Sequence, residues 1–104
     1  MTEPTNEALD LIMAEHMGWH WDHYSEGWYD EHDILQLQKE WHPSENMNQA
    51  MVCFDAYANR RILPTKLLIT RLPSGSYDLK LGRWGVWVQQ QPFARAICLA
   101  IWQA

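Results

Sequence analysis

The alternation of apolar and polar residues along the chain predicts three helices and several short strands. Apolar residues recur every three or four positions over residues 5–17, which indicates a helix with one buried face. Thr5 or Asn6 can cap its start, and Gly18 is suited to end it in a left-handed conformation. The apolar stripe of this helix consists of Leu9, Ile12, Met13, His16 and Met17.

Two further helices are expected nearer the C-terminus. Residues 44–61 form the first, with Ser44 as the N-cap, and residues 92–103 form the second, because Pro92 suits the first turn of a helix. The last segment has no charged residue after Arg95 and is apolar almost all round. Such a helix is either sandwiched between layers or used as an oligomer interface, so a homodimer through this helix is one expectation.

Three short strands are expected before the last helix, over residues 66–72, 76–82 and 86–90. The turn signals PSG and GRWG separate them, and an antiparallel meander is the simplest arrangement. Within the middle strand apolar residues alternate with polar ones, which indicates one buried and one solvated face. Helices and an antiparallel sheet in one chain of 104 residues predict a single α+β domain spanning residues 1–104.

Residues 19–42 have the least regular pattern. WHWDHYSEGWYD is predicted to form an aromatic hairpin that turns at Ser25, Glu26 and Gly27. DEHDILQLQKEW has some helical spacing, but Gln38 interrupts its apolar stripe. We therefore expect an irregular connection there.

The net charge of −5 is unevenly distributed. Residues 1–38 hold nine carboxylates and no Lys or Arg, whereas residues 39–104 hold eight basic and four acidic residues. This asymmetry predicts an acidic face and argues against direct nucleic-acid binding, which needs clustered Lys and Arg. No apolar run approaches the roughly 18 residues of a membrane span, so no membrane association is expected. Cys53 and Cys98 lack CxxC spacing and are expected to be buried, reduced thiols.

The order of several short motifs resembles the phage ABA sandwich domain, a family of small bacteriophage and prophage proteins. The matching motifs are MGW at the end of the first helix, the Pro-Ser that precedes the second, and an AIC core in the last. They rest on Met17, Gly18, Trp19, Ser44, Ala50, Ala96, Ile97 and Cys98. The resemblance implies an alpha-beta-alpha arrangement around an antiparallel sheet and a phage or prophage origin, but no particular activity.

Residues 15–33 hold four of the five histidines and six carboxylates, which raises the question of a metal site. His16 and His20 have the spacing of zinc-binding helices, yet Gly18 separates them and His16 continues an apolar stripe. On a hairpin, the polar residues able to converge are His20, Asp22, Asp30 and His32. A metal-binding module or metal-dependent enzyme built on these four is therefore an alternative hypothesis.

Seven tryptophans exceed what a core of this size readily encloses, and Trp and Tyr are favoured interface anchors. The predicted binding residues are Trp28, Tyr29, Trp41, Arg83, Trp84 and Trp87. In this set, Arg83 and Trp84 occupy a turn that suits stacking on a nucleotide or recognition of an acidic peptide. The alternative is that these aromatic residues only pack the helices on the sheet.

No GxSxG elbow, phosphate loop or dinucleotide fingerprint occurs, so neither an enzyme nor a cofactor is expected. The leading hypothesis is a non-enzymatic phage or prophage accessory protein in the cytoplasm of the bacterial host. It binds a host protein or a small signalling molecule, and interference with a bacterial defence system is its most concrete form. A third hypothesis is an acidic mimic of nucleic acid that uses residues 3–33.

Overall fold

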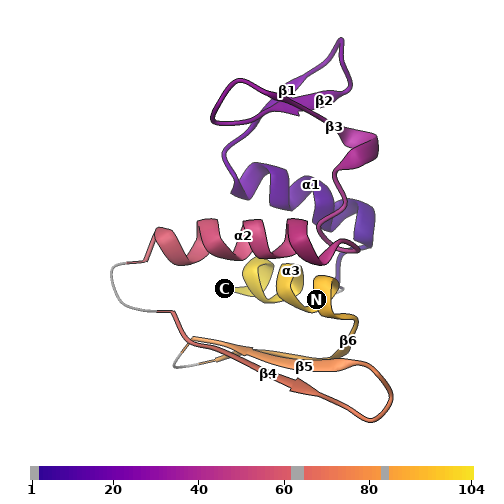
Figure 1. The fold of residues 1–104 in the computed structure, drawn as a ribbon, viewed down its shortest axis with the longest axis vertical. Helices are drawn as coiled ribbons and strands as arrows, with labels where there is room; N and C mark the ends of the chain where they lie inside the picture. The colour runs from indigo at the N-terminus through magenta and orange to yellow at the C-terminus, as the bar shows by residue number, and fades with distance from the viewer. Residues whose placement is uncertain (1–2, 62–64, 83–84) are drawn as a thin grey trace.

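The computed structural model describes residues 3–61, 65–82 and 85–104. These residues form three α-helices and two three-stranded antiparallel sheets, which confirms the predicted α+β class. The expected alpha-beta-alpha order is not seen, because the helices lie between the two sheets rather than on both faces of one sheet (Figure 1). In Figure 1 the first sheet lies at one end of the molecule, the three helices follow, and the second sheet closes the other end. We call them the N-terminal sheet, of β1 to β3, and the C-terminal sheet, of β4 to β6.

Helix α1 spans Asn6–His16 and has the caps that its sequence predicts. The Thr5 hydroxyl accepts a hydrogen bond from the Ala8 N–H at 3.2 Å. At the other end Gly18 has φ +78, in the left-handed region where glycine is favoured, and its N–H donates to the Glu15 carbonyl at 2.9 Å. Local chemistry therefore sets both ends of this helix.

The N-terminal sheet consists of β1 (His20–Asp22), β2 (Gly27–Tyr29) and β3 (Leu35–Leu37). The hairpin was expected, but the irregular connection predicted after it is wrong, because it contains β3 and a short 3-10 helix, η1 (Gln38–Glu40). The Asp30 carboxylate explains the return of the chain, since it accepts the N–H groups of His32 at 2.8 Å and Ile34 at 3.0 Å.

Helix α2 spans Met47–Asn59, so the helix predicted over residues 44–61 begins later. The prediction of Ser44 as its N-cap is wrong: the side chain of Asn46 accepts from the Gln49 N–H at 3.1 Å instead. Ser44 is buried, and its N–H donates to Asp10 Oδ1 at 3.0 Å. The Asp10 carboxylate on α1, which is distant in sequence, thus holds Ser44 outside α2.

The C-terminal sheet is the predicted meander of β4 (Leu67–Arg71), β5 (Tyr77–Leu81) and β6 (Val86–Gln91). Its register is regular between β4 and β5, whereas β6 contains a bulge opposite Asp78. The bulged residue Gln90 has φ +55, and its N–H donates to Asp78 Oδ1 at 2.9 Å. The bulge therefore has a specific side-chain partner.

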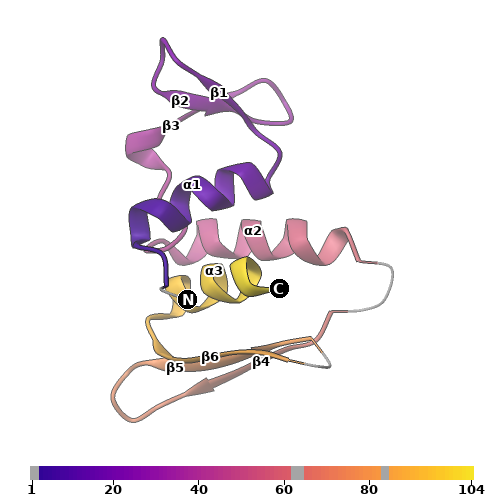
Figure 2. The ribbon, with the colours of Figure 1, turned by 180° about the vertical axis from the view of Figure 1, so that it is seen from behind.

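Helix α3 (Phe93–Gln103) is the central layer of the molecule. It contacts α1 and α2 on one side and β5 and β6 on the other, and Figure 2 shows it between these layers. Every residue from Ala96 to Ile101 is buried. Neighbouring elements of the same chain cover the apolar surface of α3 on both sides. The composition of α3 therefore no longer supports a dimer through this helix.

The two thiols are buried and free, as expected, with Cys53 on α2 and Cys98 on α3. Burial raises the pKa of Cys53 to about 12. It also raises the pKa of Cys98 above its ordinary value.

In the described part of the chain, no helix has the length and apolar character needed to cross a membrane.

Candidate binding surface

Two of the tryptophans predicted to bind a partner are buried in the N-terminal half. Trp28 is 4 % exposed and Trp41 is 5 % exposed. The Trp41 indole N–H donates to the Asp10 carbonyl at 3.0 Å, and its ring centroid lies 4.4 Å from that of Trp19. The binding role predicted for Trp28 and Trp41 is therefore corrected to core packing. Three-residue strands offer little apolar area, so large rings fill this layer.

The remaining predicted binding residues differ in their positions. Tyr29 is 38 % exposed in the N-terminal sheet, and Trp87 is 60 % exposed in the C-terminal sheet. Arg83 and Trp84 lie outside the described residues. Of the aromatic side chains that the structure describes in this set, Trp87 presents the largest exposed fraction.

The four predicted metal ligands do not form a cluster. Across residues 3–61, 65–82 and 85–104, no group of three His, Cys, Asp or Glu side chains is placed to hold a metal ion. Asp30 Oδ2 accepts the Gln36 side-chain amide at 2.9 Å, while its Oδ1 serves the turn. The Ile34 N–H is the main cause that holds the pKa of Asp30 below its ordinary value. Its carboxylate therefore organises the turn into β3 instead of joining a metal site.

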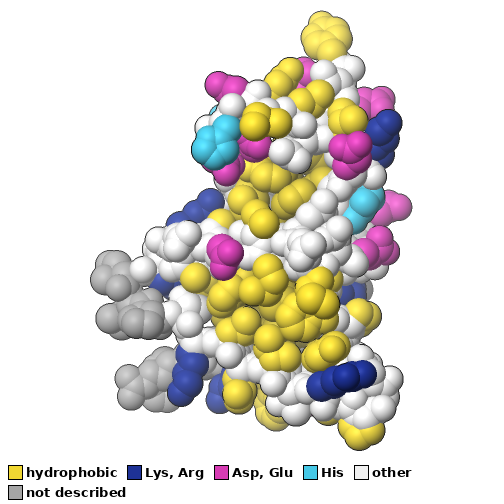
Figure 3. All heavy atoms as spheres, in the orientation of Figure 1, with side chains coloured by type: hydrophobic (Ala, Val, Ile, Leu, Met, Phe, Trp, Pro, Cys, Tyr) yellow, Lys and Arg dark blue, Asp and Glu magenta, His cyan; other side chains and the backbone are white. Residues whose placement is uncertain are grey.

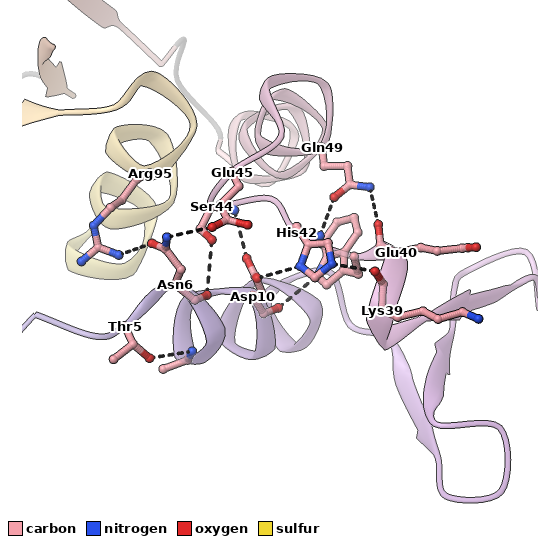
Figure 4. Close-up of polar contacts among 12 residues, drawn as sticks. Thr5, Asn6, Asp10, Lys39, Glu40, His42, Ser44, Glu45, Gln49 and Arg95 are labelled. Atoms are coloured by element: carbon pink, nitrogen blue, oxygen red, sulfur yellow. Dashed lines mark hydrogen bonds and ion pairs between the residues drawn. The ribbon is translucent and has the colours of Figure 1, made fainter.

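A polar cluster that sequence reasoning missed joins α1 to the segment before α2, as Figure 4 shows. His42 Nδ1 lies 3.5 Å from Asp10 Oδ2, and His42 Nε2 lies 2.6 Å from the Lys39 carbonyl. The contact with the Lys39 carbonyl, followed by Asp10, raises the pKa of His42. Both ring nitrogens face acceptors, which suits a protonated imidazole and leaves neither free to act as a general base.

A hollow of about 480 Å³ lies beside this cluster and is lined by Glu7, Ser25, Glu26, Leu37, Gln38, Lys39 and His42. Its lining mixes two carboxylates with a lysine and an imidazole. Because both signs of charge are present, no single charge in the lining selects one class of ligand.

The outer face of the C-terminal sheet is a regular strand surface that carries several exposed side chains. We call it the open face; it consists of Leu68, Thr70, Asp78, Lys80 and Trp87. These side chains, with part of Leu79, line a shallow hollow of about 170 Å³. Leu68 and Trp87 flank Lys80 across the three strands and are 59 % and 60 % exposed. Helix α3 contacts β5 and β6, and the buried Leu79 and Val88 mark the opposite face.

The molecule is also polarised in charge. Residues 1–59 contain twelve carboxylates and one lysine, whereas residues 60–104 contain seven Lys and Arg and one carboxylate. The first group includes the N-terminal sheet, and the second includes the C-terminal sheet. Figure 3 shows most acidic side chains toward the N-terminal sheet and most basic ones toward the C-terminal sheet. The open face therefore lies at the basic end.

Comparison with known proteins finds no matching family model, no matching curated protein and no matching solved structure. The resemblance to the phage ABA sandwich family accordingly stays a prediction.

Proposed function

We propose that this chain is a non-enzymatic binding protein whose open face contacts a partner protein. The observation that supports it is the exposure of Trp87, 60 %, beside Leu68, 59 %, on a regular strand surface. Trp is a strong interface anchor because it buries a large area with few rotatable bonds. A cation, Lys80, lies between the two apolar side chains and adds a group that can pair with an acidic partner.

At the open face, a protein partner is favoured over a small signalling molecule by the size of the hollow there. Its volume of about 170 Å³ is below the roughly 300 to 1,000 Å³ of typical small-molecule sites. A shallow surface centred on exposed apolar side chains is better matched to another protein surface.

The resemblance described above adds a setting to this proposal. It suggests a phage or prophage accessory protein that acts in the cytoplasm of a bacterial host, where the partner is a host protein. A component of a bacterial defence system is the partner that best fits such a setting.

Site-specific photo-crosslinking in bacterial cells tests the proposal. A photoreactive phenylalanine analogue replaces Trp87 in one variant and Tyr24 in a matched control. Tyr24 is 97 % exposed in the loop between β1 and β2, in the other sheet. We expect a discrete crosslinked adduct from position 87 that is absent at position 24, and that disappears when Leu68→Glu is added. No adduct at 87, or the same adducts from both positions, would rule the proposal out.

A further inference from the structure

The outer edge of β4 carries unpaired backbone groups. In the strand order of the C-terminal sheet, β4 is terminal, and no described strand pairs with its outer side. The Gly82 N–H donates to the Lys66 carbonyl at 2.9 Å, and the Leu72 N–H donates to the Ser76 carbonyl at 2.8 Å. Since alternate residues of an antiparallel pair bond the same neighbour, residues 66, 68, 70 and 72 face β5. The N–H and C=O groups of Leu67, Ile69 and Arg71 therefore point outward.

This edge differs from the other strand edges that the structure describes. At the opposite edge of the C-terminal sheet, β6 is bent by the bulge at Gln90. The edge strands β1 and β3 of the N-terminal sheet have only three residues each. Bulges and short strands are two ways in which proteins prevent unwanted strand pairing. In contrast, β4 is five residues long and keeps a continuous register with β5.

Both faces of β4 offer apolar contacts to an added strand. On the open face, Leu68 is 59 % exposed. On the inner face, Ile69 is 38 % exposed, although its cross-strand neighbour Leu79 is only 1 % exposed. Figure 3 shows hydrophobic surface continuing between α2 and the C-terminal sheet on the side that it views. An added strand would therefore bury alternate side chains on both sides.

The cations at the edge of β4 indicate which kind of strand would bind there. Lys66 immediately precedes β4 and Arg71 ends it; both are exposed, and Lys80 lies on the adjacent strand. A second copy paired antiparallel about Ile69 would place Arg71 opposite Leu67 of the other chain, and it would bring the Lys66 and Arg71 of both chains to one short edge, where like charges repel. An acidic strand meets the same cations with opposite charge.

We propose that the outer edge of β4 binds an extended acidic segment of a partner protein by strand addition. This inference rests on the proposed binding function and specifies the form and the charge of the partner. Backbone hydrogen bonds to Leu67, Ile69 and Arg71 provide affinity, and Lys66 and Arg71 provide selectivity for acidic residues.

The test uses the full chain labelled with ¹⁵N and blocked synthetic peptides of about nine residues, the length of a generous strand. One peptide alternates Val with Glu, a second alternates Val with Lys, and a third is the Glu peptide N-methylated on alternate residues. The readout is amide hydrogen exchange at each residue of β4. With the Glu peptide, we expect exchange of the Leu67, Ile69 and Arg71 amides to slow by about tenfold or more. The Leu68 and Thr70 amides, already facing β5, should not change.

The control peptides and one variant separate charge from strand addition. We expect neither the Lys peptide nor the N-methylated peptide to slow exchange at these positions. The double variant Lys66→Glu, Arg71→Glu should reverse the preference, so that the Lys peptide slows exchange and the Glu peptide does not. Reversal is informative because it requires a folded chain.

Several results would overturn the inference. These are equal effects of the Glu and Lys peptides, absence of any effect, and binding that leaves the three outward amides unchanged. Protection that grows with protein concentration without peptide would indicate pairing with a second copy instead. If crosslinks from position 87 persist while these peptide results are negative, the open face remains a binding surface and only the strand addition is wrong.

Discussion

The two sheets share one topology but use tryptophan in opposite ways. Each is an antiparallel meander of three strands. In the N-terminal sheet Trp28 is 4 % exposed, whereas in the C-terminal sheet Trp87 is 60 % exposed. The difference shows that the number of aromatic residues in a segment does not indicate whether that segment binds a partner. What covers each face of the sheet decides the role of the ring.

Helix α3 is the cause of the difference. Its apolar surface covers the inner face of β5 and β6, so the C-terminal sheet is stabilised from one side and its other face is free. The N-terminal sheet has three-residue strands and obtains its apolar contacts from aromatic side chains. Among them, the ring centroids of Trp21 and Trp28 lie 4.9 Å apart. In this sheet the buried ring of Trp28 supplies apolar contacts that α3 supplies to the other sheet, while Trp21 is 45 % exposed.

The largest expected effect comes from removing one ring from each sheet. Trp28→Ala should lower the free energy of unfolding by about 3 to 5 kcal/mol, because it leaves a large cavity in the core. Trp87→Ala should change it by no more than about 0.5 kcal/mol, because the ring is mostly exposed. Urea unfolding of both variants measures the difference, and equal losses would contradict the contrast between the sheets.

A smaller effect is expected from adding one methyl group to a glycine in each sheet. A Cβ at Gly27 would lie 2.5 Å from the Gln36 carbonyl oxygen, so Gly27→Ala must push β2 and β3 apart, at a cost of about 2 to 3 kcal/mol. Gly75 has φ +88 with no atom within 4 Å of such a Cβ, so Gly75→Ala should cost about 1 kcal/mol through backbone strain alone. Thermal unfolding ranks the pair, and a reversed order would show that backbone strain outweighs the steric conflict.

The dependence of stability on pH should arise mainly beside the N-terminal sheet, through two histidines with opposite shifts. The pKa of His42 is raised, so its stabilisation is complete below the ordinary value and is lost as the pH rises through the folded value. Burial, the main cause, lowers the pKa of His16, so its stabilisation is present above the ordinary value and is lost as the pH falls through the folded value.

Unfolding free energies near pH 5 and pH 8.5 test this assignment. His42→Gln should reduce the decline on the alkaline side, and His16→Gln should reduce the decline on the acidic side. The effect of His42 should be small, because its side chain is 46 % exposed. An unchanged pH profile in both variants would show that other groups control it.

The smallest expected effect concerns the reactivity of the two thiols, which lie in the helical layer between the sheets. Cys53 and Cys98 are buried, and their raised pKa values disfavour the reactive thiolate. A thiol-reactive disulfide reagent should leave both unmodified in the native chain and in Trp87→Ala, and should modify both in urea. Rapid reaction of the native chain would show that this layer opens without global unfolding.

The sequence alone determined the elements whose signals are local. The cap of Thr5, the left-handed Gly18 and the meander of the C-terminal sheet all depend on residues within a few positions of one another. The sequence also indicated that one face of β5 is buried and the other solvated, as its burial pattern confirms. Local propensity was sufficient for these because neighbouring residues supply the hydrogen bonds and turns involved.

Only the tertiary structure decided which predicted residues are exposed. Asp10 lies on the first helix in sequence, yet it holds Ser44 out of α2 and faces His42 across more than thirty positions. Trp41 can be buried because the Asp10 carbonyl accepts a hydrogen bond from its indole N–H. Leu68 is exposed because α3 packs against the opposite face of the C-terminal sheet. Such outcomes depend on which element covers which face, and sequence periodicity carries no information about partners that are distant along the chain.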